Sequence, residues 1–582
     1  GKLAVIKDGT GAWTLNGFFN DFSGGTEVRA GILRITNGQA LGLGELKLAG
    51  GQTHLINNFN TTYPNNVVVT ANAIVTPTRA SGSSGAVTHT LGTLSIGAHT
   101  LTSAKFSATT GSTVVFGDTT LSGAPVFAPA AGTTIQLGSA SGGFGVTQNG
   151  AGTTVLAGTN TFTSATVTAG VLQVGAGGTT GDLGSGAVTL AANTVLNFSR
   201  SNAAAFPNAI SGEGIVRSSN FNNVISLTND SHTGSTQILN GVLATNSNAP
   251  IVVGTTNAAT VYGIVGLNGD FTKSLGTGAG NITWNTGVSV SGGFAVMDAA
   301  TRVVNIGNSP TPDTLTVGVT PGFASGTNAS TNSRLKFGDV LGMALGTVEF
   351  RNPLDLGGGD RSLVVVVDGQ AAVAANLTGN ITGSGLGAGT GNALVKFGQG
   401  NLKLSGTNSY TGRTIVGGLE GAVILGSAGA FSPNAWMSLD GGATGVLGGL
   451  LGLGHGDLSA NLGQVGGGVH FQASGGFAAY GADRSVTLNG GATVVWASTP
   501  SFLANGNNLI LSQSKATGKI RLTSGIDFNG ALRTIQVNDG STAQDAEISG
   551  PLVGTGGFTK SGAGHLVISG AGTYTGNTVV SA

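Results

Sequence analysis

The stretch KFGQGNLKLSGTNSYTGRTIV, residues 396–416, returns in similar form as KSGAGHLVISGAGTYTGNTVV at residues 560–580. Both stretches begin with a lysine and two glycines, carry Ser-Gly in the middle, and end on the phrase Y-T-G-x-T followed by apolar residues. A long phrase that recurs with the same internal order is typical of a repeat protein, in which one structural unit is built several times.

Three weaker copies keep the end of this phrase, in which a ring is followed by Ser or Thr and, four places after the ring, by Thr. The pairs of ring and threonine are Phe22 and Thr26, Phe162 and Thr166, His232 and Thr236, Tyr410 and Thr414, and Tyr574 and Thr578. With their flanking phrases the copies lie near residues 7–48, 148–190, 208–245, 361–426 and 533–582. We interpret these pairs as structural repeat positions, and His232 as a packing substitute for the aromatic ring rather than a ligand.

The local pattern is that of β-strands separated by tight turns. Segments such as SATVTAG at 164–170 and GTTVLAG at 152–158 alternate apolar and polar residues, which is the period of a strand. Gly, Asn, Asp and Ser interrupt these segments, as turns with positive φ require. Sustained helical periodicity is not found, so the sequence predicts an all-β fold.

The spacing of the rings favours one all-β architecture over another. Tandem sandwich domains would recur about every 100 residues, whereas subtraction of the ring positions gives separations of 140, 70, 178 and 164 residues. A parallel β-solenoid accepts the insertion of whole coils, each of about 20–25 residues. We therefore predict a single continuous parallel β-helix over residues 1–582, with about 25 coils.

Composition limits the partners and the setting of the chain. Of its 582 residues 8% are charged, with 24 basic and 24 acidic residues, and Cys is absent. This balance provides no basic surface for nucleic acid, and a thiolate metal site or a disulfide framework is excluded. The sequence contains no apolar run long enough for a transmembrane helix. Because it begins without Met and stops within a repeat phrase, we expect it to be a piece of a longer protein.

The paired stretches at 396–416 and 560–580 resemble the autotransporter-associated β-strand repeat of bacterial surface passengers and adhesin-like proteins. The resemblance implies a right-handed parallel β-helix that is displayed at the bacterial cell surface or secreted. It supplies no catalytic residues and no cofactor, so we expect a protein that is not an enzyme.

Candidates for chemistry or contact are few. The best acidic cluster is Asp440 with His455 and Asp457, where turn residues in a glycine-rich loop are the simpler interpretation. Trp284 and Trp436 stand near turns, where exposed rings would contact sugars or a neighbouring subunit. Trp13 and Trp496 lie within alternating strands, so we expect these two to pack in the core or at its corners.

The leading hypothesis is a structural or adhesive surface protein whose open sheet edges allow end-to-end or lateral self-association, up to an extracellular fibre or layer. The alternative is a β-helix that binds glycans of a host or cell surface, or cleaves polysaccharides, which requires exposed aromatic rings and paired carboxylates on one face. A toxin passenger is a third class that the sequence leaves open.

Overall fold

The computed structural model describes residues 3–80, 85–105, 111–220, 222–255, 261–285, 290–307, 310–323, 334–339, 341–357, 362–384, 392–417, 421–440 and 448–581. Two compact units divide the chain. Unit one contains Gly1–Val252 and Gly278–Gly280, and unit two contains Val253–Thr277 and Asn281–Ala582. The predicted continuity of one solenoid through both units stays a prediction, and each unit is described by itself.

Unit one begins with a stack of parallel strands that come from successive coils. Its first sheet consists of β1 (Val5–Lys7), β3 (Thr26–Val28), β5 (Leu46–Leu48), β8 (Val67–Val69), β11 (Leu94–Ile96), β14 (Thr119–Leu121) and β17 (Ala140–Ser141). Val5 pairs with Thr26, Thr26 with Leu46 and Leu46 with Val67, so the first coils are nearly equal in length.

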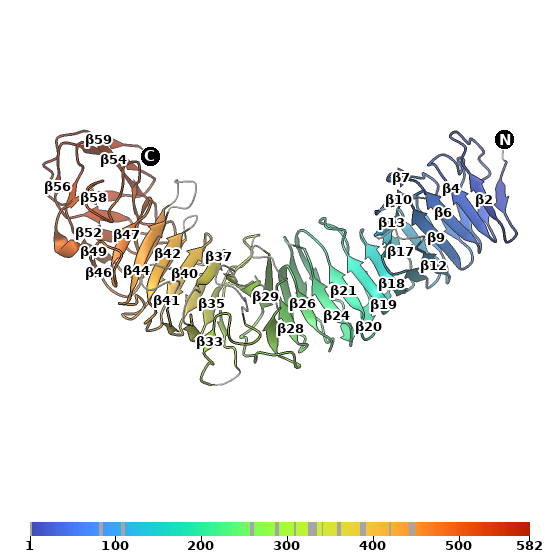
Figure 1. Cartoon of the computed structure of the whole chain (residues 1–582), viewed down its shortest axis with the longest axis horizontal. Helices are drawn as coiled ribbons and strands as arrows, with labels where there is room; N and C mark the ends of the chain where they lie inside the picture. The colour runs from blue at the N-terminus through green and yellow to red at the C-terminus, as the bar shows by residue number, and fades with distance from the viewer. Residues whose placement is uncertain are drawn as a thin grey trace. The chain divides into compact units, whose positions relative to one another are not determined.

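Two further ladders complete the coils of unit one. The first runs through β2 (Ala12–Leu15), β4 (Ile32–Ile35), β6 (Gln52–Ile56), β9 (Ala73–Thr78), β12 (Thr100–Ser103) and β15 (Val126–Pro129). The second runs through β7 (Thr61–Thr62), β10 (Thr88–Thr90), β13 (Ser112–Val115) and β16 (Thr133–Leu137). Both ladders reach the long strand β18 (Val146–Leu156). In Figure 1 the blue strands β2, β4, β6 and β9 lie side by side in this order.

The later coils of unit one continue the same stacking. Strand β18 pairs with β19 (Ser164–Val174), which is followed by β20 (Ala187–Leu190), β21 (Val195–Phe198), β23 (Ile210–Gly212), β24 (Ile215–Ser218) and β26 (Thr236–Ile238). A separate ladder contains β22 (Ala203–Phe206), β25 (Val224–Leu227) and β27 (Gly241–Thr245). Short strands with alternating burial are what the sequence pattern predicts.

Unit two contains two long parallel ladders. One consists of β29 (Tyr262–Leu267), β31 (Ser291–Val296), β34 (Arg334–Phe337), β37 (Leu363–Val367), β40 (Asn392–Phe397), β42 (Gly412–Gly417), β44 (Ala435–Asp440) and β47 (Val469–Phe471). The other consists of β32 (Thr301–Val304), β35 (Thr347–Phe350), β38 (Ala375–Leu377), β41 (Leu402–Leu404), β43 (Ala422–Leu425), β45 (Gly449–Leu453), β48 (Gly475–Ala479), β51 (Leu509–Leu511), β54 (Leu532–Val537), β57 (Gly557–Ser561) and β59 (Thr578–Val580).

Shorter ladders close the remaining side of the coils in unit two. They are β33 (Leu315–Thr316), β36 (Leu354–Asp355) and β39 (Ile381–Thr382); β46 (Leu458–Ala460), β49 (Arg484–Leu488), β52 (Ile520–Leu522), β55 (Ala546–Ile548) and β58 (Leu566–Ile568); and β50 (Val494–Val495), β53 (Ile526–Asp527) and β56 (Leu552–Val553). Among the described residues, the single helical element is the 3-10 turn Asn489–Gly491. None of the described helical segments is long and apolar enough to cross a membrane.

The observed architecture confirms the predicted fold class, a right-handed parallel β-helix. Coils in unit two differ in length more than the repeat phrases suggest. Leu402 pairs with Val423 after a short coil, whereas Phe477 pairs with Leu511, which lies considerably further along the chain. The predicted number of about 25 coils stays a prediction.

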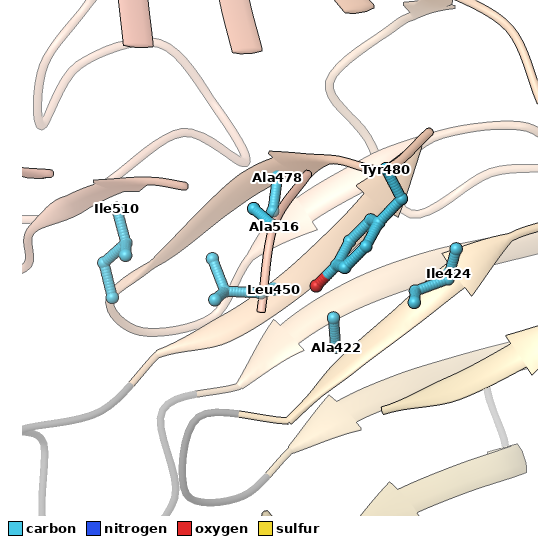
Figure 2. Close-up of a cluster of buried hydrophobic side chains, with 7 residues drawn as sticks. All are labelled: Ala422, Ile424, Leu450, Ala478, Tyr480, Ile510 and Ala516. Carbon is cyan, nitrogen blue, oxygen red and sulfur yellow. The ribbon is translucent and has the colours of Figure 1, made fainter. Parts of the chain in front are cut away.

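One part of unit two is buried on both faces of its sheet. Strands β43, β45, β48 and β51 carry buried residues at every position. Alternate residues along these strands point to opposite faces, and one face packs against the turn that follows β51. Figure 2 shows this second core, which is made by Ala422, Ile424, Leu450, Ala478, Tyr480, Ile510 and Ala516.

A polar network holds that turn against the sheet. Gln513 and Asn401 exchange two hydrogen bonds through their amide groups, 3.0 and 3.1 Å long, although 112 residues separate them. The hydroxyl of Tyr480 donates to Gln513 as well. The Lys515 ammonium donates to the carbonyl oxygens of Gly369 and Ala371, both at 3.3 Å. The turn therefore fastens coils that are far apart in the sequence.

Candidate functional site

The asparagine of the phrase T-N-S-Y-T-G bonds to the coils on both sides of its own. Asn408 lies in the turn between β41 and β42 and is 3% exposed. Its Oδ1 accepts the N–H of Ile381 from the preceding coil at 2.8 Å, and its Nδ2 donates to the carbonyl oxygen of Ala430 in the following coil at 2.8 Å. One side chain thus satisfies two backbone groups that would otherwise be buried without partners.

The same connection is made in the copy around Phe162. Asn160 precedes the ring by two residues, as Asn408 precedes Tyr410. Its Oδ1 accepts the N–H of Ala140 at 2.8 Å, and its Nδ2 donates to the carbonyl oxygen of Asp182 at 2.8 Å. The asparagine of the repeat therefore joins three successive coils through side-chain hydrogen bonds.

The ring and the threonine four residues later bond to each other wherever the ring carries a polar atom. Tyr410 Oη and Thr414 Oγ1 are 2.7 Å apart, and Tyr574 Oη and Thr578 Oγ1 are 2.6 Å apart. Tyr410 is fully buried, and this burial raises the pKa of its hydroxyl to about 12. The hydrogen bond between the tyrosine and the threonine four residues later thus closes a turn at the corner of a coil.

His232 stands at the ring position where two other copies have tyrosine, and both of its ring nitrogens lie close to polar atoms inside the protein. Its Nδ1 lies 2.7 Å from Asp230 Oδ1, and its Nε2 lies 3.3 Å from Thr236 Oγ1. The order Asp–His–Thr is that of a hydrolase relay, but all three side chains are buried. Asp230 is further held by the Thr245 hydroxyl at 2.6 Å. The polar atoms of this group are thus bonded to one another inside the fold, and its role as a packing substitute stays a prediction.

The two phenylalanine copies differ from each other. Phe162 is fully buried, with Gly184 of the next coil directly against it: a Cβ there would lie 2.5 Å from the Phe162 carbonyl oxygen, and φ is +67°. Phe22 is half-buried. Thr26 is buried, like Thr236 and Thr414, whereas Thr166 is half-buried and Thr578 is exposed. The five threonines therefore do not form one uniform ladder.

Lysines at the start of the phrase, of which Lys7 and Lys396 are buried and Lys560 is half-buried, were not singled out from the sequence. Lys396 is fully buried, and its ammonium donates to the carbonyl oxygen of Gly398 at 2.5 Å. Lys7 donates in the same way to Gly9 at 2.7 Å, and Lys560 donates to Gly562. The signal was present in the sequence as K-x-G at 7–9, 396–398 and 560–562.

Gln148 takes the place of this lysine in the copy near Phe162. Its Nε2 donates to the carbonyl oxygen of Gly150 at 2.7 Å and to that of Ala169, in the next coil, at 3.1 Å. Lys7 likewise reaches Ala30 of the next coil at 2.9 Å. A hydrogen-bond donor at the position of Lys7 and Gln148 therefore binds carbonyl oxygens of its own turn and of the following coil. Like the asparagine of the repeat, it joins successive coils.

Trp284 and Trp436 are not exposed, as the sequence suggested they would be. The prediction of exposed contact rings is wrong for Trp284 and Trp436, which are 1% and 5% exposed. Trp284, in β30 (Ile282–Trp284), packs against Phe323 with ring centroids 4.9 Å apart. Trp436 lies beneath the Arg413 guanidinium, 5.3 Å from the ring centroid.

The two tryptophans expected to pack behave differently. Trp496 is fully buried and donates from Nε1 to the carbonyl oxygen of Ala504 at 3.3 Å. Trp13 pairs in register with the buried Leu33 but is 45% exposed. It belongs to the first described coil, where one neighbouring coil covers it.

This distribution predicts the fluorescence of the chain. Acrylamide and iodide should quench Trp13, while the buried Trp284, Trp436 and Trp496 should be protected. The substitution Trp13→Phe should therefore remove most of the quenchable emission and leave blue-shifted emission behind. The control is Trp496→Phe, which should leave the quenchable fraction unchanged. A large quenchable fraction that persists in Trp13→Phe would contradict the placement.

Asp440, His455 and Asp457, the acidic cluster of the sequence, do not form a common site in the structure. Asp440 ends β44 and pairs with the Arg413 guanidinium at 2.7 Å. Asp457 precedes β46 of another sheet, where its Oδ1 accepts the N–H of Ser485 at 2.8 Å. His455 is exposed. Within the described ranges, no group of three His, Asp or Glu residues is placed to hold a metal ion.

Comparisons with known proteins identify the repeat. The model of the passenger-associated-transport-repeat matches residues 5–35, 146–174, 394–418 and 558–582. These segments contain the rings Phe22, Phe162, Tyr410 and Tyr574, and they leave out the copy at His232.

A curated relative is the adhesin BmaC autotransporter of Brucella suis biovar 1 (strain 1330), which is 29% identical over 362 residues. The match covers 54% of this chain and 10% of the relative. No solved structure matches the chain. Four segments that match the passenger-associated-transport-repeat, on a parallel β-helix, make the chain similar to autotransporter passengers and indicate a protein of the cell surface or the extracellular space.

Proposed function

We propose that this chain is a non-enzymatic, adhesive β-helix that attaches its cell to another surface. The observation that carries the proposal is its similarity, over 54% of its length, to a protein whose name describes an adhesin. The passenger-associated-transport-repeat, present in four segments, is in keeping with a passenger role.

The chemistry of the repeat supports a structural role for the phrase itself. Asn408, Tyr410 and Thr414 use their polar atoms within or between coils. Recognition of a partner must then come from side chains that point outward. A parallel β-helix suits this division, because alternate residues of each strand face inward and outward.

Two narrower roles remain predictions. Self-association, end-to-end or lateral, would give filaments that are visible by electron microscopy of the purified chain. Cleavage of polysaccharides would require paired carboxylates on one face. Asp440 ends a strand of one sheet, whereas Asp457 precedes a strand of another sheet.

The adhesive function is tested with beads coated with the purified 582-residue chain. The beads are applied to cultured animal, plant and bacterial cells and to immobilised polysaccharides, with beads coated with heat-unfolded chain as the control. We expect retention on at least one of these surfaces that resists washing and depends on the fold. Retention no greater than that of the unfolded control on every surface would overturn the proposal.

A further inference from the structure

Three phenylalanine side chains in unit one are exposed to solvent. Phe18, Phe19 and Phe59 are 75%, 87% and 77% exposed, although rings of this size are usually buried. Leu43, whose N–H bonds to the Phe22 carbonyl oxygen of the preceding coil, is 73% exposed. Contiguous exposed apolar side chains on a folded surface mark contact sites more often than chance placement.

The register of the coils brings these rings to one corner. Leu15 of β2 pairs with Ile35 of β4, and Ile35 pairs with Leu55 of β6. Phe19 follows Leu15 by four residues, and Phe59 follows Leu55 by four residues. The rings therefore lie in the turns that follow β2 and β6, at the same corner and two coils apart, and successive coils are spaced by about 5 Å.

The backbone that presents the rings is held in place. Nδ2 of Asn37 donates to the carbonyl oxygens of Asn16 and Gly17 at 3.0 and 2.8 Å, which fixes the turn before Phe18. The N–H of Phe59 bonds to Asn57 Oδ1 at 3.1 Å, and the carbonyl oxygen of Phe59 accepts from the Thr61 hydroxyl at 2.9 Å. A corner that is ordered before binding loses less entropy when a ligand arrives.

The polar surroundings of the rings are amides. The corner segments 15–20, 36–39 and 56–60 contain no Lys, Arg, Asp or Glu, and the exposed side chains beside the rings include Asn16, Gln39 and Asn60. The guanidinium of Arg79 reaches this corner, where it donates to the carbonyl oxygens of Asn58, Gly85 and Ala86. An anionic membrane surface would call for basic residues here. A protein partner would need about 800 Å² of this surface, more than three rings and a leucine supply.

We propose that this corner, formed by Phe18, Phe19 and Phe59 with their amide neighbours, binds a neutral carbohydrate chain. The C–H faces of pyranose rings stack on the phenylalanines, and their hydroxyls exchange hydrogen bonds with Asn16 and Gln39, which both donate and accept. The spacing of successive coils is close to the length of one pyranose unit, so a chain laid along the stack meets Phe19 and Phe59 with alternate rings. The inference rests on the proposed adhesive function and names its ligand class.

The test is an array of immobilised neutral oligosaccharides built from glucose, galactose, mannose and N-acetylhexosamines, with sialylated and sulphated glycans beside them. The full chain is compared with the triple variant F18A/F19A/F59A. Its matched control is Phe144→Ala, because Phe144 is an exposed ring, at 41%, in the turn after β17 and outside the corner. Thermal unfolding of each variant shows that the fold is kept, as expected for changes at exposed positions.

We expect binding to neutral glycans that the triple variant weakens at least about tenfold, because it removes all three stacking rings, and that Phe144→Ala leaves intact. Equal binding by the triple variant would overturn the site. Preference for sialylated or sulphated glycans would overturn the neutral ligand class. Adhesion of coated beads to cells without any glycan binding would overturn this inference while leaving the adhesive function standing, whereas loss of adhesion altogether would remove both.

Discussion

The substitution Asn408→Ala is expected to lower the free energy of unfolding of the chain by about 2–6 kcal/mol, because removal of the amide leaves the Ile381 N–H and the Ala430 carbonyl oxygen buried without partners. Each such group costs about 1–3 kcal/mol. The measurement is denaturant unfolding followed by circular dichroism.

The control for this substitution is Asn434→Ala in the same unit. Asn434 is exposed, and its side chain makes none of the hydrogen bonds found among the described residues. Its loss should change stability by less than about 0.5 kcal/mol. Equal effects of the two substitutions would show that Asn408 does not fasten coils.

Stability is expected to rise with pH between about 7 and 10. Burial, assisted by the nearby Lys515 ammonium, lowers the pKa of Lys396 to about 7 in the folded chain. In the unfolded chain an ordinary lysine titrates near 10.4. Between these values the unfolded state binds more protons, so the free energy of unfolding increases with pH, by at most a few kcal/mol. The contribution is lost as pH falls back through 7.

Above pH 10 the sign reverses. Burial raises the pKa of Tyr410 to about 12, and it also raises the pKa of Tyr63 and Tyr480. The unfolded chain then loses tyrosine protons before the folded chain does, and stability falls. Stability should therefore be greatest near pH 10.

The measurement is the denaturant midpoint at intervals from pH 6.5 to 11.5. Lys396→Met should flatten the rise between pH 7 and 10, whereas Lys403→Met, at a half-buried lysine of the same coil, should preserve it. Lys336 has a similarly lowered pKa through burial, but it pairs with the Asp368 carboxylate, which favours its charged form and makes Lys396 the cleaner probe. A profile that is flat from pH 7 to 10 would contradict the buried ammonium.

The fold could be predicted because each coil repeats the same local chemistry. Alternation indicated the strands, glycines and asparagines indicated the turns, and the uneven spacing of the rings distinguished a solenoid from tandem domains. The burial of Trp284 was also readable, because Ile282 and Trp284 alternate around Thr283 and so share one face of the strand.

Other features depend on neighbours that are distant in the sequence. Trp436 is covered by Arg413 and His470, which lie on the neighbouring strands β42 and β47, and no local pattern shows that contact. The burial of Lys396 was not predicted, because a charged side chain among glycines is usually solvated. The turn that carries Gln513 meets Asn401 across 112 residues, a pairing that depends on how several coils stack.

The same limit applies to the recognition surface. Phe18, Phe19 and Phe59 occur in GFFN and NNFN, short phrases that say little until the register of β2, β4 and β6 places them at one corner. The repeat phrase drew attention through its recurrence, yet its polar atoms are used inside the fold. These exposed rings belong to no repeated phrase, so only the three-dimensional structure indicates that they lie at one corner.

Amide hydrogen exchange tests most directly whether the repeated phrase fastens one coil to the next. The N–H groups of Ala140 and Ile381 bond to the side chains of Asn160 and Asn408 rather than to a strand. We predict that both exchange as slowly as amides within the parallel ladders, and that Asn408→Ala accelerates exchange at Ile381 alone. Exchange of both amides at the rate of exposed turns in the unmodified chain would contradict this role of the phrase.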